Sequence, residues 1–208
     1  MGRPREHNEA TRAALLSAAE HLVAAGGPDA LSVRAIAEEV GTTTRAVYSV
    51  FGSKEGLVAA LAQRAFELIA AGLDELAETD DVVADLIETG VGVFRGFVLE
   101  HPSLYRIAFQ RIVPGLEENP DLTAARERTF PRLQAKVQRL ADAGLLDGKS
   151  VRDAAVEFNA MCEGLANSEL RGRVLPILPQ GREEHAWREA LGTVVRGFAP
   201  ASGTRRRR

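Results

Sequence analysis

Apolar residues recur at intervals of three and four along almost the whole chain, which is the spacing of one face of an α-helix. Leu15, Ala18 and Leu22 follow this rhythm near the start, and Leu57 and Leu61 begin a longer example. No segment alternates apolar and polar residues for long, as a half-buried strand would. The sequence therefore predicts an all-α protein of about nine helices.

The limits of these helices follow from N-capping residues, from glycines that end a helix and from prolines that begin one. The predicted spans are 8–26, 32–40, 43–51, 53 to a break at 79–81, 82–100, 102 to a loop delimited by Pro114 and Pro120, 122–143, 150–171 and 182–198. Pro131 lies inside the seventh span, where a proline removes a backbone donor and is expected to kink or divide the helix.

Charge is distributed unevenly along the 208 residues, whose net charge is -3. Residues 1–64 carry seven basic and seven acidic side chains, whereas residues 65–204 carry fifteen basic and twenty-two acidic ones. An anion-binding surface is therefore expected near the N-terminus and not in the acidic remainder. The four arginines at 205–208 are interpreted as a disordered, solvated tail that could add weak affinity for polyanions.

The composition excludes several classes of protein. No run of apolar residues approaches the length needed to cross a bilayer, and the first residues lack the apolar core of a signal peptide, so a cytoplasmic protein without a membrane partner is expected. Cys162 is the only cysteine, which excludes an internal disulfide and a cysteine-based zinc site. It is interpreted as a small buried hydrophobe, and no metal or cofactor is expected.

An enzyme is the main alternative from another class. The sequence contains no zinc-type HExxH, nucleophile elbow, phosphate loop or dinucleotide glycine motif, and its four histidines are scattered. We therefore expect no enzymatic activity.

The stretch SVRAIAEEVGTTTRAVYSVF indicates two helices that cross at a steep angle. Ala37 is a small residue where the two backbones approach, Gly41 supplies the sharp turn, and Ile36, Val47 and Val50 pin the second helix onto the first. This is the pattern of a helix-turn-helix, in which the second helix enters the DNA major groove and the helix N-termini meet phosphates and base edges.

Side-chain chemistry separates the expected roles of these residues. Arginine forks match guanine or a phosphate, hydroxyl groups donate to phosphates, and a lysine adds a point charge. The candidate DNA-binding residues are Ser32, Arg34, Thr43, Thr44, Arg45, Tyr48, Ser49 and Lys54. Whether Arg3, Arg5 or the terminal arginines also touch DNA is left open.

The run from Leu31 to Leu57 resembles the DNA-binding domain of the TetR family of bacterial transcriptional regulators. The resemblance is carried by Ile36, Ala37, Gly41, Tyr48, Phe51, Lys54, Glu55 and Leu57. It implies a homodimer with two recognition helices, a C-terminal domain that binds a small molecule, and release from a palindromic operator when that ligand binds. Repression is favoured over activation by the resemblance alone. Val50 departs from the family pattern, in which a histidine often precedes the phenylalanine, so no phosphate contact is expected there.

On this basis the predicted organisation is a helix-turn-helix domain at 1–55, a helical effector-binding and dimerisation domain at 56–200, and a basic tail at 201–208. The last two helices carry apolar residues in narrow seams, which suit a four-helix bundle made by two subunits. The predicted dimer-interface residues are Val151, Ala155, Leu165, Trp187, Leu191, Val194 and Phe198. An ordinary intrachain core is the alternative.

The middle helices hold most of the remaining aromatic residues, and an apolar pocket there would suit a hydrophobic or amphipathic effector. The candidate pocket residues are Phe66, Phe94, Phe97, Tyr105, Phe109, Phe130, Phe158, Asn159, Met161 and Cys162. Gly90, Gly92 and Gly96 lie in a helical stretch, where each weakens the helix unless close packing or a ligand offsets the loss. A helical scaffold that uses its N-terminal unit for protein contact is a further alternative.

Overall fold

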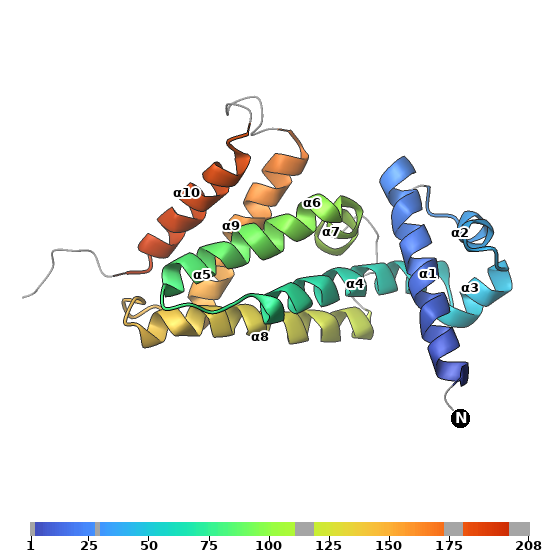
Figure 1. The fold of residues 1–208 in the computed structure, drawn as a ribbon, viewed down its shortest axis with the longest axis horizontal. Coiled ribbons are helices and arrows are strands. Elements are labelled where there is room, and N and C mark those ends of the chain that lie inside the picture. Colours follow the sequence, from blue (N-terminus) through green and yellow to red (C-terminus); the bar gives the residue numbers. More distant parts are fainter. Residues whose placement is uncertain (1–2, 28–29, 111–118, 173–180, 200–208) are drawn as a thin grey trace, which may run out of the picture. The chain divides into compact units, whose positions relative to one another are not determined.

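The computed structural model describes residues 3–27, 30–110, 119–172 and 181–199, with the backbone alone for residues 3–8 (Figure 1). Within these ranges all regular structure is helical and no strand occurs. Because α5, the π-helix η2 and α6 follow one another without a break, the described residues form nine helical stretches. The predicted fold class is thereby confirmed.

The helices are α1 (Arg3–Gly26), α2 (Val33–Val40), α3 (Thr44–Phe51), α4 (Lys54–Glu75), α5 (Val82–Glu88), η2 (Thr89–Arg95), α6 (Gly96–Glu100), α7 (Pro102–Phe109), α8 (Pro120–Asp142), α9 (Val151–Leu170) and α10 (Glu183–Arg196). Several details differ from the sequence prediction, among them the following two. Helix α1 begins at Arg3 and not at Asn8. Pro131 lies inside α8 and does not divide it.

The chain packs as two compact units. The first comprises the residues up to Leu68 together with His101–Glu127, and the second comprises Ile69–Glu100 together with the residues from Arg128 onward. Helices α4 and α8 each run from one unit into the other. The predicted boundary between residues 55 and 56 stays a prediction. It separates two functions, whereas the compact units are defined by which residues pack together.

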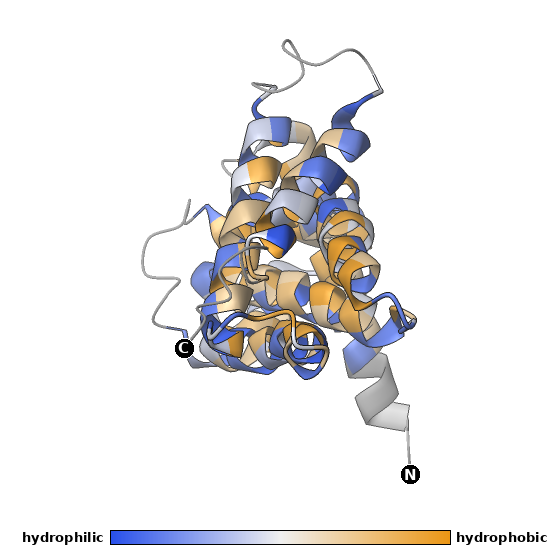
Figure 2. Ribbon diagram, turned by 90° about the vertical axis from the view of Figure 1, so that its left-hand side faces the viewer, coloured by the Kyte–Doolittle hydropathy of each residue, from blue (hydrophilic) through white to orange (hydrophobic). Residues whose placement is uncertain are grey.

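In the first unit α1, α2 and α3 pack around a small apolar core. Leu15, Ile36 and Leu57 are completely buried, and Val47 of α3 is almost so. The helices show hydrophobic and hydrophilic residues interleaved along each ribbon, as amphipathic helices with one buried face do (Figure 2). This packing holds the short helices α2 and α3, which would not be stable alone.

In the second unit the π-helix η2 lies close to α9 and α10. A Cβ atom added to Gly90 would overlap Leu191 Cδ1 and would lie 3.1 Å from Phe158 Cζ and 3.2 Å from Cys162 Sγ. Close helix packing therefore explains Gly90, one of the two explanations that the sequence left open. It does not explain Gly96, where an added Cβ would meet no described atom within 4 Å.

A buried carboxylate fixes the turn between α4 and α5 in the second unit. Asp85 accepts hydrogen bonds from the backbone N and the Oγ1 of Thr79, at 2.8 and 2.7 Å, and from Nη1 of Arg139 on α8. Burial alone would raise the pKa of Asp85, but the hydrogen bonds from Arg139 and Thr79 outweigh it and hold the pKa at about 2. The turn is thus tied to α8 by a charged group at neutral pH.

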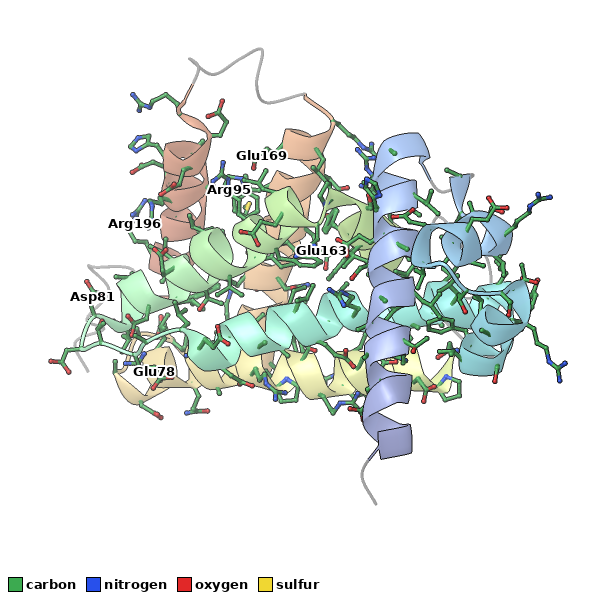
Figure 3. The ribbon with its side chains drawn as sticks, turned by 45° about the vertical axis from the view of Figure 1, so that its right-hand side comes forward. Glu78, Asp81, Arg95, Glu163, Glu169 and Arg196 are labelled. Carbon is green, nitrogen blue, oxygen red and sulfur yellow. The ribbon has the colours of Figure 1, made fainter. Side chains whose placement is uncertain are left out.

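A second buried polar cluster joins η2, α9 and α10. Arg95 donates from Nε and Nη2 to the two carboxylate oxygens of Glu169, at 3.1 and 2.8 Å, and Nε1 of Trp187 donates to the same carboxylate at 2.8 Å. The side chains of Arg95 and Glu169 are only 15% and 10% exposed. Both residues lie side by side in Figure 3, between the ribbons that carry them.

Helix α4 is long and apolar enough to cross a membrane by length and composition alone. Gln63, Arg64 and Glu67 interrupt its apolar residues, so it contains no unbroken apolar run of that length. Of the most hydrophobic window of this helix, 56% is buried inside the protein. Leu57, Leu61 and Ala65 are completely buried, which is the arrangement of a core helix.

Candidate nucleic-acid interface

The turn between α2 and α3 is built by local capping. Ser32 is the N-cap of α2, and its Oγ accepts a hydrogen bond from the backbone N of Ala35 at 3.4 Å. Helix α2 ends at Gly41, whose φ of 71° lies in the left-handed region that favours glycine. Thr43 then caps α3 by accepting from the backbone N of Ala46 at 3.2 Å. The predicted helix-turn-helix is therefore present, with Ser32 and Gly41 in their predicted roles, while Thr43, predicted as the first residue of the second helix, is its N-cap.

The two faces of α3 divide as the sequence predicted. Val47 is buried, and Val50 and Phe51 are half-buried against the unit. The opposite face exposes Thr44, Arg45, Tyr48 and Ser49 to solvent, with Tyr48 50% exposed. Such an exposed tyrosine has its hydroxyl available for a phosphate.

The N-termini of α2 and α3 lie open to an anion. Neither helix, both described in full, has an acidic residue in its first turn. Ser32 and Thr43 use an oxygen lone pair for capping, which leaves each hydroxyl proton able to donate outward. Helix N-termini carry a partial positive charge, so these two positions suit phosphate groups.

The N-terminus of α4 differs, because a carboxylate of the chain already occupies it. Ser53 Oγ accepts from the backbone N of Gly56 at 3.0 Å. A hydrogen bond from its own backbone N, followed by one from Ser53, lowers the pKa of Glu55. Lys54 is exposed beside this group. Lys54 thus adds an exposed positive charge beside the start of α4, while the helix end itself is satisfied internally.

Gly52, between α3 and α4, adopts φ 74° and ψ -51°. An L-residue with a side chain is strained in this conformation, so Gly52→Ala is expected to destabilise the protein by roughly 1–2 kcal/mol even though the added Cβ meets no described atom. Urea denaturation followed by circular dichroism measures the change.

The matched control is Gly96→Ala, because Gly96 is helical, with φ -52° and ψ -52°, and an added Cβ there also meets no described atom. This variant is expected to be neutral or more stable by up to about 1 kcal/mol. Equal destabilisation of both variants would contradict the assignment of strain to Gly52.

The sequence did not predict three side-chain contacts of the helix-turn-helix. Two of them join it to α1, and the third joins two residues of α2. The guanidinium of Arg12 on α1 lies 5.8 Å from the ring centroid of Phe51, a cation–π contact. His21 Nδ1 lies 3.0 Å from Glu39 Oε1 of α2. Arg34 donates to Glu38 one turn later. The first two join helices that are distant in the sequence, while the i,i+4 spacing of the third could have indicated it.

The candidate effector residues do not form one cluster within either unit. In the first unit Phe66, Tyr105 and Phe109 lie together, with ring centroids 5.1 Å apart for Phe66 with Phe109 and for Tyr105 with Phe109. Arg126 on α8 places its guanidinium 5.6 Å from the centroid of Phe66. This is an apolar group with one cation beside it.

The other candidate effector residues lie in the second unit. Phe94, Phe97, Phe158 and Cys162 are buried, and Phe130 is half-buried. Burial raises the pKa of the Cys162 thiol, which agrees with a small apolar residue and not with a reactive thiolate. Asn159 donates to Glu163 Oε1 at 2.7 Å. Met161 instead lines an open groove on the surface.

Four of the predicted dimer-interface residues are buried within the single chain, and the interface itself stays a prediction. Ala155, Trp187, Leu191 and Phe198 are at most 2% exposed inside a single chain, although Phe198 also lines the groove between α9 and α10. Their burial fits the alternative of an intrachain core. Val151, Leu165 and Val194 are half-buried. The seam of large apolar residues thus marks the face that α9 and α10 turn inward.

The outward face of α9 carries a line of small residues instead. Val156, Ala160 and Gly164 of α9 are exposed and follow one another at intervals of four. Between α9 and α10 lies an open groove of about 540 Å³, lined by Glu157, Ala160, Met161, Thr193, Val194, Gly197 and Phe198. Small side chains of this kind allow another helix to approach closely.

Two further predictions concern metal binding and the arginines near the two ends of the chain. No group of three or more His, Cys, Asp or Glu residues that could hold a metal ion occurs in the ranges that the structure describes. The side chains of Arg3 and Arg5 and the whole of residues 205–208 lie outside the described residues.

Comparison with known proteins gives consistent matches along the chain. Residues 15–61 match the family described as bacterial regulatory proteins, tetR family. Residues 87–194, more than half of the chain, match the tetracyclin repressor-like C-terminal domain. A curated relative, the HTH-type transcriptional regulator Rv1816 of Mycobacterium tuberculosis, is 25% identical over 175 residues. That match covers 82% of this chain, which spans 64% of the length of the relative.

Solved structures with similar folds extend over almost the whole chain. A protein with unknown function from Rhodococcus sp. RHA1 is 24% identical with a TM-score of 0.77, covering 91% of this chain and 95% of that one. The structure of RolR in complex with the ligand resorcinol is 20% identical with a TM-score of 0.62, covering 94% and 95%. At these identities the likeness concerns the fold.

Proposed function

Because the chain belongs to the tetR family of bacterial regulatory proteins, we propose that it is a ligand-responsive transcriptional regulator that binds a palindromic DNA operator as a homodimer. A small hydrophobic or amphipathic effector releases it, so that it acts as a repressor in the cytoplasm. The family consists of regulatory proteins, which confirms the prediction that the chain is not an enzyme.

The observation that carries the proposal is the exposed face of α3. Thr44, Arg45, Tyr48 and Ser49 all carry groups that can donate hydrogen bonds, and α3 has no acidic residue along its length. Together with the open N-termini of α2 and α3, this is a surface that pairs with phosphates and base edges. Two such helices in a dimer would occupy successive major grooves, about 34 Å apart.

The proposed dimer uses the outward faces of α9 and α10. Two-fold symmetry brings the same surface of both subunits together, so a self-complementary face is required. Val156, Ala160 and Gly164 form a line of small side chains, and the adjacent groove can receive a side chain of the partner. Four helices would then pack at shallow angles.

The proposed effector is apolar or amphipathic, because the side chains available for its pocket are mostly aromatic. In the first unit Phe66, Tyr105 and Phe109 lie together with Arg126 beside them, which suits an aromatic compound with a polar or anionic group. A fold relative, RolR, is known in complex with resorcinol, an aromatic ligand.

Connectivity offers a route from the effector to the DNA. Two residues, Gly52 and Ser53, separate α3 from α4, which runs from the first unit into the second. A shift of α4 would therefore move the reading helix through Gly52 and Ser53. An effector can drive such a shift only as far as it binds the two positions of α4 unequally.

The decisive experiment is selection of DNA fragments of the source organism that bind the full-length protein. One enriched palindromic sequence is the expected result, with affinity that falls steeply between low and moderate salt as counterions are released. A protein-contact scaffold or an enzyme would enrich no sequence.

Arg45→Ala is expected to weaken binding to the selected operator by about 1–3 kcal/mol if Arg45 forms a bidentate contact to a base. The reason is that the substitution removes the guanidinium group and with it two hydrogen bonds that only the cognate base can accept. Fluorescence anisotropy with the operator and with single-base variants measures both the affinity and the loss of discrimination.

Two control variants test whether the effect depends on the guanidinium group and the position of Arg45. Arg45→Lys keeps the charge and loses the fork, so it should lose discrimination as well if a base is read. Arg128→Ala removes an exposed arginine of α8 and should leave operator affinity nearly unchanged. An Arg45→Ala protein with unaltered affinity would remove Arg45 from the interface.

A further inference from the structure

Arg34, one of the expected DNA contacts, is held by an acidic residue of its own helix. Its Nε donates to Oε1 of Glu38 at 2.8 Å, one turn further along α2. The hydrogen bond to Glu38, and then the charge of that carboxylate, raise the pKa of Arg34. Both side chains are largely exposed, at 83% and 66%. The pair thus lies on the surface that would approach DNA.

This ion pair has the wrong polarity to serve the stability of α2. Arg34 stands in the first turn, where a helix favours an anion, and Glu38 stands near the end, where it favours a cation. A basic residue placed four positions before an acidic one is also the less stabilising order. Exposed pairs contribute little in any case. A reason other than folding is therefore needed for Glu38.

We propose that Glu38 is a specificity-determining residue, which withholds the charge of Arg34 from loosely bound DNA and yields it to a phosphate only in the closely docked complex. The inference rests on the proposed function as a DNA-binding regulator. It adds a residue that does not itself pair with DNA but sets how well operator and non-operator sequences are distinguished.

The physical basis is the difference between the two modes of binding. Non-specific binding depends almost entirely on the number of phosphates that protein cations neutralise. An arginine already paired with Glu38 contributes little to that number. In the docked complex a phosphate at the N-terminus of α2 meets the Ser32 hydroxyl, the open helix end and Arg34 together, so it can displace Glu38.

Glu38→Gln in the full-length protein tests the proposal. Affinity for a duplex of random sequence is expected to increase by roughly threefold to fivefold per subunit at low salt, because one unpaired charge is gained. The slope of log K against log salt should steepen by about 0.9 per subunit. Operator affinity should rise less, so the ratio of operator to random affinity should fall.

The matched control is Glu39→Gln. Its replacement changes the net charge equally, but Glu39 pairs with His21 of α1 and with no arginine among the side chains that the structure describes. Its effect on random DNA should be smaller and its salt slope unchanged. A second control is Glu38→Gln in an Arg34→Gln background, where the salt slope should no longer respond to position 38.

Three outcomes would overturn the inference: equal effects of Glu38→Gln and Glu39→Gln, an unchanged ratio of operator to random affinity, or an effect of Glu38→Gln that persists without Arg34. Because Glu38 is exposed, the variants are expected to fold, and circular dichroism verifies this. Failure of the parent protein to select any operator would instead remove the proposed function, which distinguishes the two failures.

Discussion

Glu169→Ala is expected to destabilise the protein by about 3–5 kcal/mol, the loss that follows when one member of a buried ion pair is removed. The side chain of Arg95 is only 15% exposed and would keep its charge without a partner carboxylate. Nε1 of Trp187 would also lose its hydrogen-bond acceptor. Thermal and urea unfolding, followed by circular dichroism, measure the change.

The variant Glu169→Gln separates charge from hydrogen bonding. Its amide oxygen can still accept from Arg95 or from Trp187, so a smaller loss than for alanine is expected. Arg188→Ala serves as the comparison, because Arg188 pairs with Glu88 on a more exposed surface, where such pairs contribute about 0–1 kcal/mol. Equal stability of Glu169→Ala and Arg188→Ala would contradict the role of the buried cluster.

The elements that the sequence predicted well are those that local residues determine. Ser32, Thr43 and Ser150 each cap a helix within three residues along the chain, so their helices begin where capping chemistry places them. The exposed and buried faces of α3 follow from its short apolar repeat. These predictions needed no knowledge of the remaining chain.

What the sequence did not reveal depends on contacts between distant segments. Arg95 and Glu169 are 74 residues apart, and isolated charged residues ordinarily indicate a solvated surface. The π-helix around Gly90 forms where Leu191 and Phe158 leave no room for a side chain, which no local pattern records. Each of these features arises only once the second unit is packed.

The residues predicted for the dimer interface show what an apolar helical pattern can and cannot indicate. Large apolar residues at helical spacing identify the face of a helix that is buried, but not whether the chain itself or a partner buries it. In α9 and α10 that face packs inward at Trp187 and Leu191. On α9 a second line of small residues, Val156, Ala160 and Gly164, points outward, and its low hydrophobicity did not single it out in the sequence.

The second prediction with a large expected effect concerns this outward face of α9. Ala160→Glu is expected to weaken the proposed dimer by a factor of about 100 or more, because two-fold symmetry would bury a carboxylate from each subunit near the other. Ala160 is exposed in the single chain, so the variant should fold normally. Light scattering and sedimentation at micromolar concentrations measure the subunit association.

Charge reversal makes the test specific to this surface. Ala160→Lys alone should dissociate in the same way, whereas a mixture of the Ala160→Glu and Ala160→Lys chains should associate again as opposite charges meet. Ala135→Glu, at an exposed position of α8, should remain dimeric. Since a single subunit reaches only one half-site, the dissociated variants should also lose at least a hundredfold in operator affinity, and the mixture should recover it. If Ala160→Glu stays as dimeric as Ala135→Glu, the subunits must meet through another surface, and α9 and α10 serve the core alone.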